Sequence, residues 1–319
     1  MHPFRFAVQA TKATTGAQWR ELARKAEDLG YATLFVADHY LGPGPAARES
    51  RLPPQHLAPI AAMATAAAVT ETLRVGCRVF CVDYHVPAVL AKEAATLDLL
   101  SDGRLEFGIG AGWSEREYRS MGLDFAAPAR RVDKLEDVVA LLKAHWSGEP
   151  LNHQGPFATA TGYAGLPLPA RRPHPSIMIG GARRRVLSLA AREGDIVSIN
   201  NVPFDAVNDA GRTPAEEAAH RFAAVREAAG ERLPDLEIES SPFFTEITDD
   251  PAAAVARVAG IMGVPPDGLP AHPNVLVGSL DEVTDRLQQR RETYGANYIT
   301  VQQREMERFA PAVARLAGR

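Results

Sequence analysis

Residues 97–118, LDLLSDGRLEFGIGAGWSEREY, decide the fold that we predict for this chain. Three leucines close an apolar helix, the turn sequence Ser101-Asp102-Gly103 follows, and residues 104–109 form a buried strand. Glycines at positions 108, 110 and 112 then allow something to approach the backbone closely where the strand ends. Because ligands of α/β proteins bind at the carboxyl ends of strands, we expect a site here.

The composition limits the class of protein. The chain has 319 residues, of which 46% are hydrophobic and 23% charged, so its length allows two ordinary domains or one α/β barrel. A formal net charge of −4 argues against a nucleic-acid partner, and the lack of a long apolar run predicts no membrane span. Cys77 and Cys81 are too far apart along one predicted strand to form a disulfide. We therefore expect a cytoplasmic protein.

Strands and helices alternate along the whole chain. The predicted strands cover residues 4–8, 33–37, 73–82, 104–109, 176–179, 195–199, 236–240 and 298–301. Such alternation predicts a parallel sheet, closed as a barrel or open and doubly wound. A dinucleotide fingerprint normally follows the first strand, whereas GIGAG follows the fourth and leads into a wide loop. We therefore predict an α/β protein with the (β/α)8 TIM barrel fold, and keep the doubly wound sheet as the alternative.

Three segments lack helical or strand periodicity. They are residues 41–55, 148–175 and 263–278, all rich in proline and glycine. The middle one is too long for a plain connection between elements. We predict that residues 1–319 form a single barrel domain in which these segments are lids or insertions.

Two stretches could carry chemistry. Asp38 and His39 end the second strand, where a histidine can exchange a proton and an adjacent acid can orient it; the alternative is a histidine that only caps a loop. The run Gly180-Gly181-Ala182-Arg183 joins a strand to a helix, so its amides and the helix dipole suit a phosphate. A tight turn with solvated arginines is the plainer interpretation.

Metal-binding and hydrolase motifs are missing from the sequence. It contains no H-x-H, H-E-x-x-H or C-x-x-C spacing, and no G-x-S-x-G nucleophile elbow. We predict no metal site.

Three long stretches together resemble a known family. They are residues 19–40 (WRELARKAEDLGYATLFVADHY), 73–113 (LRVGCRVFCVDYHVPAVLAKEAATLDLLSDGRLEFGIGAGW) and 177–197 (IMIGGARRRVLSLAAREGDIV). With them the chain resembles the bacterial luciferase-like monooxygenase superfamily, and within it the oxidoreductases that use the deazaflavin coenzyme F420. The resemblance implies a (β/α)8 barrel with a flavin-like ring at the carboxyl ends of the strands. It also implies a homodimer.

The resemblance assigns roles to the residues of the predicted site. His39 matches the active-site histidine near the reacting carbon, and we expect Asp38 to orient it. Similar enzymes back the ring with a bulge that contains a non-proline cis peptide, which maps to Cys77, Arg78 and Val79, with the cis bond between Arg78 and Val79.

Two glycine-rich segments complete the implied cofactor site. Gly110, Ala111 and Gly112 would lie along the cofactor. The run Gly180, Gly181, Ala182 and Arg183 would hold its phosphate tail.

The chain departs from family members that oxidise a sugar phosphate. Those carry an acid after the first strand and another directly after the glycines, where this chain has Thr11-Lys12 and Trp113-Ser114, with Glu115 and Glu117 nearby. Sugar phosphates are therefore disfavoured. The residues Tyr40, Phe80, Trp113 and Tyr84 suggest an aromatic, apolar substrate surface, although each could instead be packing.

We expect an enzyme that transfers a hydride between F420 and a small organic substrate. The alternatives are an FMN-dependent monooxygenase, a flavin-binding protein without turnover, and a metal-dependent barrel hydrolase that would contain zinc.

Overall fold

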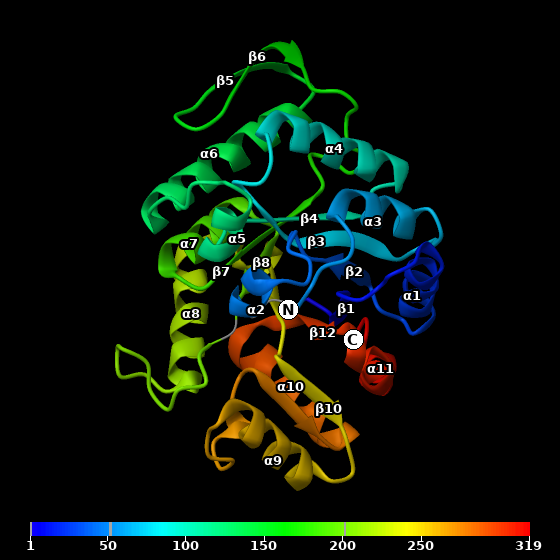
Figure 1. The fold of residues 1–319 in the computed structure, drawn as a ribbon, viewed down its shortest axis with the longest axis vertical. Helices are drawn as coiled ribbons and strands as arrows, with labels where there is room; N and C mark the ends of the chain where they lie inside the picture. Colours follow the sequence, from blue (N-terminus) through cyan, green and yellow to red (C-terminus); the bar gives the residue numbers. More distant parts are fainter. Residues whose placement is uncertain (1, 51–52, 201) are drawn as a thin grey trace. The chain divides into compact units, whose positions relative to one another are not determined.

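A computed structural model describes residues 2–50, 53–200 and 202–319. Eight of its strands form a closed barrel in the order β1, β12, β9, β8, β7, β4, β3, β2 (Figure 1). These strands are β1 (Arg5–Gln9), β2 (Thr33–Val36), β3 (Arg74–Cys81), β4 (Leu105–Gly110), β7 (Ser176–Gly181), β8 (Ile196–Ile199), β9 (Glu237–Ser240) and β12 (Ala296–Gln302). Each coincides with a predicted strand, so the barrel is confirmed and the open, doubly wound sheet is wrong.

Helices separate the barrel strands along the chain. They are α1 (Gly16–Asp28), α2 (Pro45–Ser50), α3 (Pro59–Ala67), α4 (Pro87–Leu100), α5 (Glu115–Ser120), α6 (Pro128–Trp146), α7 (Arg184–Glu193), α8 (Pro214–Ala229), α9 (Pro251–Met262), α10 (Leu280–Tyr294) and α11 (Met306–Leu316). Short 3-10 turns are η1 (Gly230–Asp235), η2 (Leu269–Ala271) and η3 (Gln303–Glu305). Pro87 lies in the first turn of α4, as predicted, because the missing proline N–H has no partner to lose there. None of the helices in the described part of the chain is long and apolar enough to cross a membrane.

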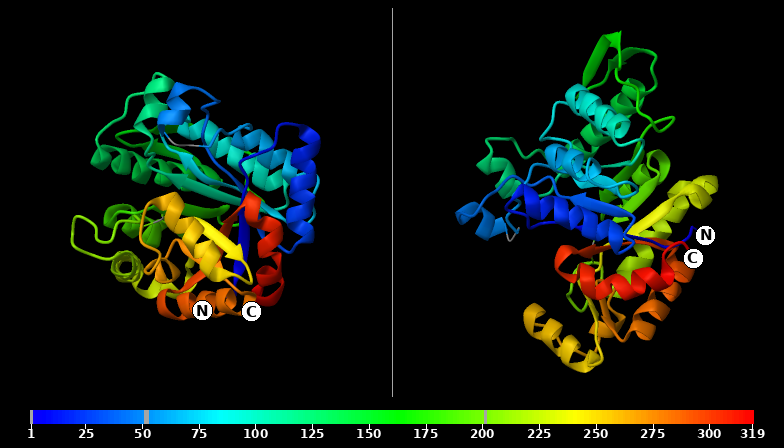
Figure 2. Two further views of the ribbon diagram at one scale, coloured as in Figure 1. Left: turned by 60° about the horizontal axis from the view of Figure 1, so that its bottom comes forward. Right: turned by 90° about the vertical axis from the view of Figure 1, so that its right-hand side faces the viewer.

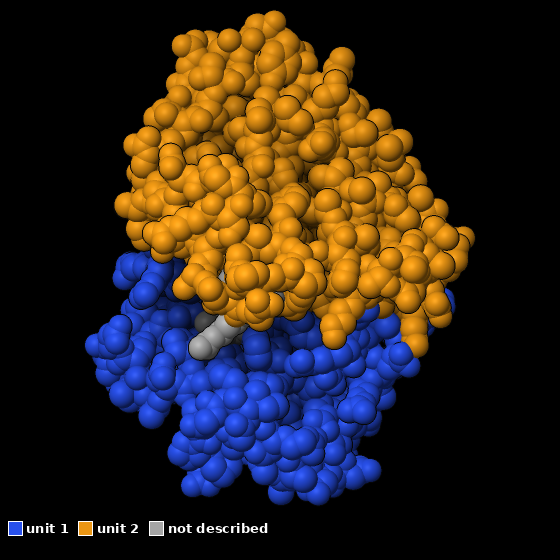
Figure 3. Space-filling view, in the orientation of Figure 1, with its two compact units in different colours: residues 1–9, 28–32, 181–319 blue, residues 10–27, 33–180 orange. Residues whose placement is uncertain are grey.

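The chain divides into two compact units that interleave in sequence. Unit 1 consists of residues 1–9, 28–32 and 181–319, and unit 2 of residues 10–27 and 33–180 (Figure 3). Unit 1 therefore contributes β1, β8, β9 and β12, while unit 2 contributes β2, β3, β4 and nearly all of β7. A single domain over residues 1–319 stays a prediction.

The core of unit 2 is built on β4. All six of its residues are buried, and it pairs in parallel with both β3 and β7. Helix α6 packs against α4, which contacts β4, and buries an apolar stripe that includes Leu135, Val139 and Leu142, as its spacing predicts. Trp146 at the end of α6 packs edge-on against Phe107 of β4 at 5.3 Å between ring centres. This buried sheet gives the neighbouring strand ends a fixed position.

All three segments expected to be irregular contain regular structure. Residues 41–55 include α2, although positions 51 and 52 lie outside the described residues. Residues 148–175 hold an antiparallel hairpin of β5 (Pro150–Gln154) and β6 (Thr159–Ala164). The predictions of irregularity for these two segments were wrong because α2, β5 and β6 are short and mostly exposed, so that they lack an apolar period.

The third segment ends in β11 (Val275–Gly278), which pairs in parallel with β10 (Phe244–Ile247) outside the barrel. Both α9 and α10 pack against β11, and these yellow and orange segments lie side by side (Figures 1 and 2). A small apolar cluster that includes Phe244, Val258 and Val275 fills the space between them. Residues 263–278 are thus part of a packed layer of unit 1.

Candidate active site

The candidate site lies in unit 2, where β2 and β3 end and α5 begins. The two strands pair in parallel with Val36 opposite Cys77, so their carboxyl ends meet at the same edge of the sheet. Asp38, His39 and Tyr40 follow β2 directly. This arrangement brings Asp38 to Cys81, 43 positions away in sequence, and His39 to Glu117, 78 positions away.

His39 is held by a glutamate of α5. Its Nδ1 lies 2.6 Å from Oε2 of Glu117, whose other oxygen accepts a hydrogen bond from the Tyr40 amide at 2.7 Å. A carboxylate only accepts hydrogen bonds, so Nδ1 carries a proton and Nε2 is the nitrogen left to gain or lose one. Side-chain exposure is 20% for His39 and 0% for Glu117. The imidazole therefore combines a fixed tautomer with an accessible edge.

The pKa of Glu117 reflects two opposing effects. Burial by itself raises the pKa of this carboxyl. The hydrogen bonds from His39 and the Tyr40 amide help to outweigh burial, so that the pKa lies below its ordinary value. Glu117 is consequently a buried carboxylate at neutral pH, suited to stabilise a protonated imidazole.

Asp38 does not orient His39, which corrects our expectation. It is buried, and its Oδ2 accepts a hydrogen bond from the Cys81 amide at 2.8 Å and lies 2.9 Å from Nε2 of His85. Successive residues of an extended chain point to opposite sides, so neighbours in sequence do not share a partner. Asp38 instead ties the end of β2 to the end of β3.

Tyr118 fixes α5 against β3. Its hydroxyl donates to Asp83 at 2.7 Å and lies 2.9 Å from Sγ of Cys81, while Lys134 donates to the other oxygen of Asp83 at 2.7 Å. Burial raises the pKa of the Cys81 thiol to about 12, so this cysteine stays protonated. Cys77 and Cys81 are both buried and unbridged, as predicted. Because Tyr118 is held in this way, its neighbour Glu117 is held beside His39.

The predicted bulge of β3 is present. Its register with β4 shifts between Cys77 and Phe80, and the peptide between Arg78 and Val79 is cis, which confirms the assignment made from the resemblance. Arg78 and Val79 are half-buried in a strand whose flanking residues are buried. The bulge thus presents a short stretch of backbone and the Val79 side chain at an otherwise closed surface.

The glycines after β4 are needed by the protein's own packing. A Cβ atom on Gly108 would lie 2.1 Å from the Cys77 carbonyl oxygen, and one on Gly110 would lie 2.8 Å from Cγ2 of Val79. Gly112 has φ +72°, and a Cβ there would lie 1.9 Å from the Tyr118 hydroxyl. The groups that approach these glycines closely are therefore the β3 bulge and Tyr118. The sequence predicted a close approach to the backbone here but not which group makes it.

The aromatic residues divide into exposed and buried ones. Trp113 is 61% exposed and Tyr40 42% exposed, and the Trp113 ring meets the His39 ring edge-on at 6.0 Å between centres. Phe80 is fully buried, 5.4 Å from the ring of Phe107, so its assignment to a substrate surface is wrong. Tyr84 is half-buried and contacts Tyr40 at 6.0 Å between ring centres.

The run from Gly180 to Arg183 spans the end of β7 and the start of α7. Gly180 belongs to unit 2 and the next three residues to unit 1. A Cβ on Gly181 would lie 2.5 Å from Cγ1 of Val186, so close packing on α7 requires this glycine. Arg183 is the N-cap of α7, is exposed, and makes no side-chain cap, which leaves the first amides of the helix to other partners.

The sequence contained one unused signal for α5 and Glu117. Ser114-Glu115-Arg116-Glu117 has the spacing of a capping box, typical of a helix start. Ser114 makes no side-chain cap, and Glu117 turns its carboxylate to His39 instead. Among the residues the structure describes, no group of three or more His, Cys, Asp or Glu side chains could hold a metal ion.

Comparison with known proteins gives relatives with two different cofactors. An FMNH2-dependent dimethylsulfone monooxygenase of Pseudomonas putida is 32% identical over 109 residues, which are 34% of this chain and 30% of that protein. An F420-dependent glucose-6-phosphate dehydrogenase of Amycolatopsis mediterranei is 30% identical over 138 residues, 43% of this chain and 40% of that enzyme. The matches thus span less than half the length of these two relatives.

Solved structures extend the likeness to the whole chain. The F420-dependent tetrahydromethanopterin reductase of Methanopyrus kandleri superposes with a TM-score of 0.75 at 15% identity, covering 98% of this chain and 99% of that one. An EDTA monooxygenase from Chelativorans sp. BNC1 superposes with a TM-score of 0.77 at 15% identity, covering 99% of this chain and 95% of that one. These two structural likenesses establish the fold. The family model described as luciferase-like monooxygenase matches residues 1–312 of this chain. The chain therefore belongs to the luciferase-like monooxygenase family, whose members are oxidoreductases or monooxygenases.

Proposed function

We propose that this protein is an F420-dependent oxidoreductase that transfers a hydride between the deazaflavin and a small organic substrate. The observation that carries the proposal is the His39–Glu117 pair at the end of β2, a partly exposed imidazole whose Nδ1 donates to a buried carboxylate. Such a pair can accept or donate one proton at Nε2. The F420-dependent relative supports the choice of cofactor.

The residues that would hold the cofactor fit a flat, uncharged ring. Val79 of the bulge, Ala111 and Gly112 are each half-buried and carry no charge, so a planar ring could be backed by them without desolvating an ion. The bulge residues Cys77 and Arg78 would support that contact through their backbone. Gly110 would stay beneath it, in contact with Val79.

The phosphate tail would be bound by the segment from Gly180 to Arg183. The uncapped first turn of α7 offers amide N–H groups, and the exposed Arg183 offers a positive charge.

The protein's own contribution is positioning and proton transfer. When bound, the deazaflavin supplies two-electron hydride chemistry. Nε2 of His39 would accept the proton that leaves the substrate as its hydride departs, or donate one in the reverse direction. Glu117 would stabilise the imidazolium, while Tyr40 and Trp113 would contact an apolar substrate and exclude water. Asp38 would act as a positioning residue through the Cys81 amide and His85.

Titration of the apoprotein with F420 and with FMN tests the cofactor. We expect tight binding of F420 alone; tight binding of FMN alone would favour a monooxygenase, which the Pseudomonas relative also supports. His39→Ala should bind F420 as the parent does but lose turnover. His220→Ala, which changes an exposed histidine of α8, is the matched control and should keep full activity. An active His39→Ala variant would refute the assigned role, and cofactor binding without turnover of any substrate would indicate a binding protein.

A further inference from the structure

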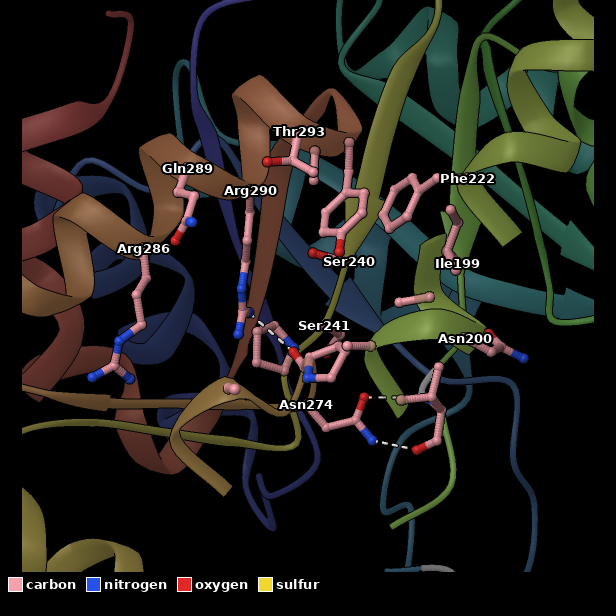
Figure 4. Close-up of a pocket in the computed structure, with 18 of the residues that line it drawn as sticks. Ile199, Asn200, Phe222, Ser240, Ser241, Asn274, Arg286, Gln289, Arg290 and Thr293 are labelled. Carbon is pink, nitrogen blue, oxygen red and sulfur yellow. Dashed lines mark hydrogen bonds between the residues drawn. The ribbon is translucent and has the colours of Figure 1, made fainter. Parts of the chain in front are cut away.

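A second candidate site lies wholly within unit 1. A cavity of about 300 Å³ opens at the carboxyl ends of β8 and β9, between α8, α10 and the segment after η2 (Figure 4). Asn200 follows β8, and Ser240 and Ser241 end and follow β9. The carboxyl ends of barrel strands are where ligands of this fold bind.

One wall of the cavity is flat and apolar. Phe222 of α8 and Tyr294 at the end of α10 stack with 4.5 Å between ring centres and 13° between planes. Pro242 and Pro273 also line the cavity. Such walls favour a ligand with a planar apolar body.

Three polar side chains of the cavity, those of Arg290, Ser240 and Ser241, have incomplete hydrogen-bond partners. Arg290 donates to the carbonyl oxygens of Pro273 at 3.0 Å, His272 at 3.3 Å and Val275 at 2.8 Å. A guanidinium has five N–H groups, so two remain without a partner among the described residues. The hydroxyls of Ser240 and Ser241 likewise make no hydrogen bond in the described parts of the chain, although Ser241 is only 4% exposed.

The cavity is electrostatically unbalanced. No aspartate or glutamate lines it, while Arg286 and Arg290 both do. Burial lowers the pKa of Arg290 to about 10, which still leaves it protonated at neutral pH. A half-buried cation without a counter-ion in the cavity wall is costly, and an anionic ligand would compensate its charge. The three carbonyl contacts explain how Arg290 anchors the segment after η2, but they leave two of its N–H groups without a partner among the described residues.

We infer that this cavity binds a small organic anion, a carboxylate carried on a flat apolar ring. The carboxylate would accept hydrogen bonds from Arg290, Ser240 and Ser241, and the ring would lie against Phe222 and Tyr294. This inference does not rest on the proposed redox function, because every residue that carries it belongs to unit 1.

Calorimetric titration of the full chain with benzoate, acetate and benzyl alcohol tests the inference without measuring activity. We expect saturable binding of benzoate, at least tenfold weaker binding of acetate, which lacks the ring, and of benzyl alcohol, which lacks the charge. Ser241→Ala removes a hydroxyl without an internal partner and should weaken benzoate binding about tenfold with the melting temperature unchanged. Arg290→Lys keeps the positive charge but loses the paired N–H groups of the guanidinium, and it should weaken benzoate binding further than Ser241→Ala does.

The matched control is Arg257→Gln, which removes a positive charge of α9 that pairs with Glu246 outside the cavity. It should bind benzoate as the parent does. Absence of saturable benzoate binding up to about 10 mM, where even a weak fragment-sized ligand registers, would overturn the inference. Equal affinity for benzoate and benzyl alcohol would overturn it too, as would a folded Ser241→Ala variant with parental affinity.

Discussion

Replacing Glu117 with glutamine is the sharpest test of the imidazole's role. Glutamine has nearly the same volume, but it has one acceptor oxygen where the carboxylate uses two, one for His39 and one for the Tyr40 amide. If the amide oxygen keeps the Tyr40 N–H, the amide NH2 faces His39, and Nδ1 must become an acceptor. The proton then moves to Nε2, the wrong tautomer for a base.

The magnitude follows from the competing hydrogen bonds. Restoring the active tautomer in Glu117→Gln leaves the partly buried Tyr40 N–H without a partner, at a cost of about 1–2 kcal/mol. That cost corresponds to a fall in kcat of about five- to thirty-fold. Loss of the carboxylate charge also removes the group that stabilises the imidazolium formed when His39 accepts a proton.

The assay combines kinetics with a spectroscopic readout. Nitrogen NMR of the imidazole should show Nδ1 protonated in the parent and Nε2 protonated in Glu117→Gln, with cofactor affinity within about twofold because His39 and Glu117 only position the proton. The control is Glu115→Gln, which lies on the same helix but faces solvent, paired with Arg119 at 2.6 Å. It should behave as the parent. An unchanged tautomer, or kcat within a factor of about two of the parent, would refute the reasoning.

Two further predictions concern stability. Gly112→Ala and Gly122→Ala both place alanine at positive φ, which costs about 1–2 kcal/mol. Only the alanine at position 112 collides with the Tyr118 hydroxyl, so in urea denaturation Gly112→Ala should lose about 1–3 kcal/mol more of the free energy of unfolding than Gly122→Ala. Equal losses would show that Tyr118 can move aside. Burial alone raises the pKa of Glu217, but the hydrogen bonds and charges of Arg221 and Arg212 together outweigh burial and lower the pKa to about 2. Since the folded-state pKa is the lower one, at most about 3 kcal/mol of stability is present above pH 4.5 and lost as the pH falls towards 2. Glu217→Gln should reduce the loss of stability between pH 7 and pH 3. A variant whose free energy of unfolding in urea falls between these two pH values by as much as that of the parent would contradict the prediction.

Most of the barrel could be predicted because its elements carry local signals. Each barrel strand is a short apolar run bounded by turn residues, and each long helix repeats apolar positions at helical spacing. The elements missed, such as α5, the β5–β6 hairpin and the β10–β11 pair, are short and depend on partners distant in sequence. The cis peptide between Arg78 and Val79 was predicted from the family resemblance and has no local signature of its own.

The sequence by itself determined the alternation of strands and helices, the position of His39 at a strand end, and the need for glycine after β4. Only the tertiary structure decided which carboxylate serves His39, since Asp38 is its neighbour in sequence but Glu117 is its neighbour in space. The physical reason is that an extended chain directs successive side chains to opposite sides, so a partner must come from another element. The same holds for the cavity of unit 1, where residues from six separate elements meet: β8, α8, β9, η2, α10 and β12.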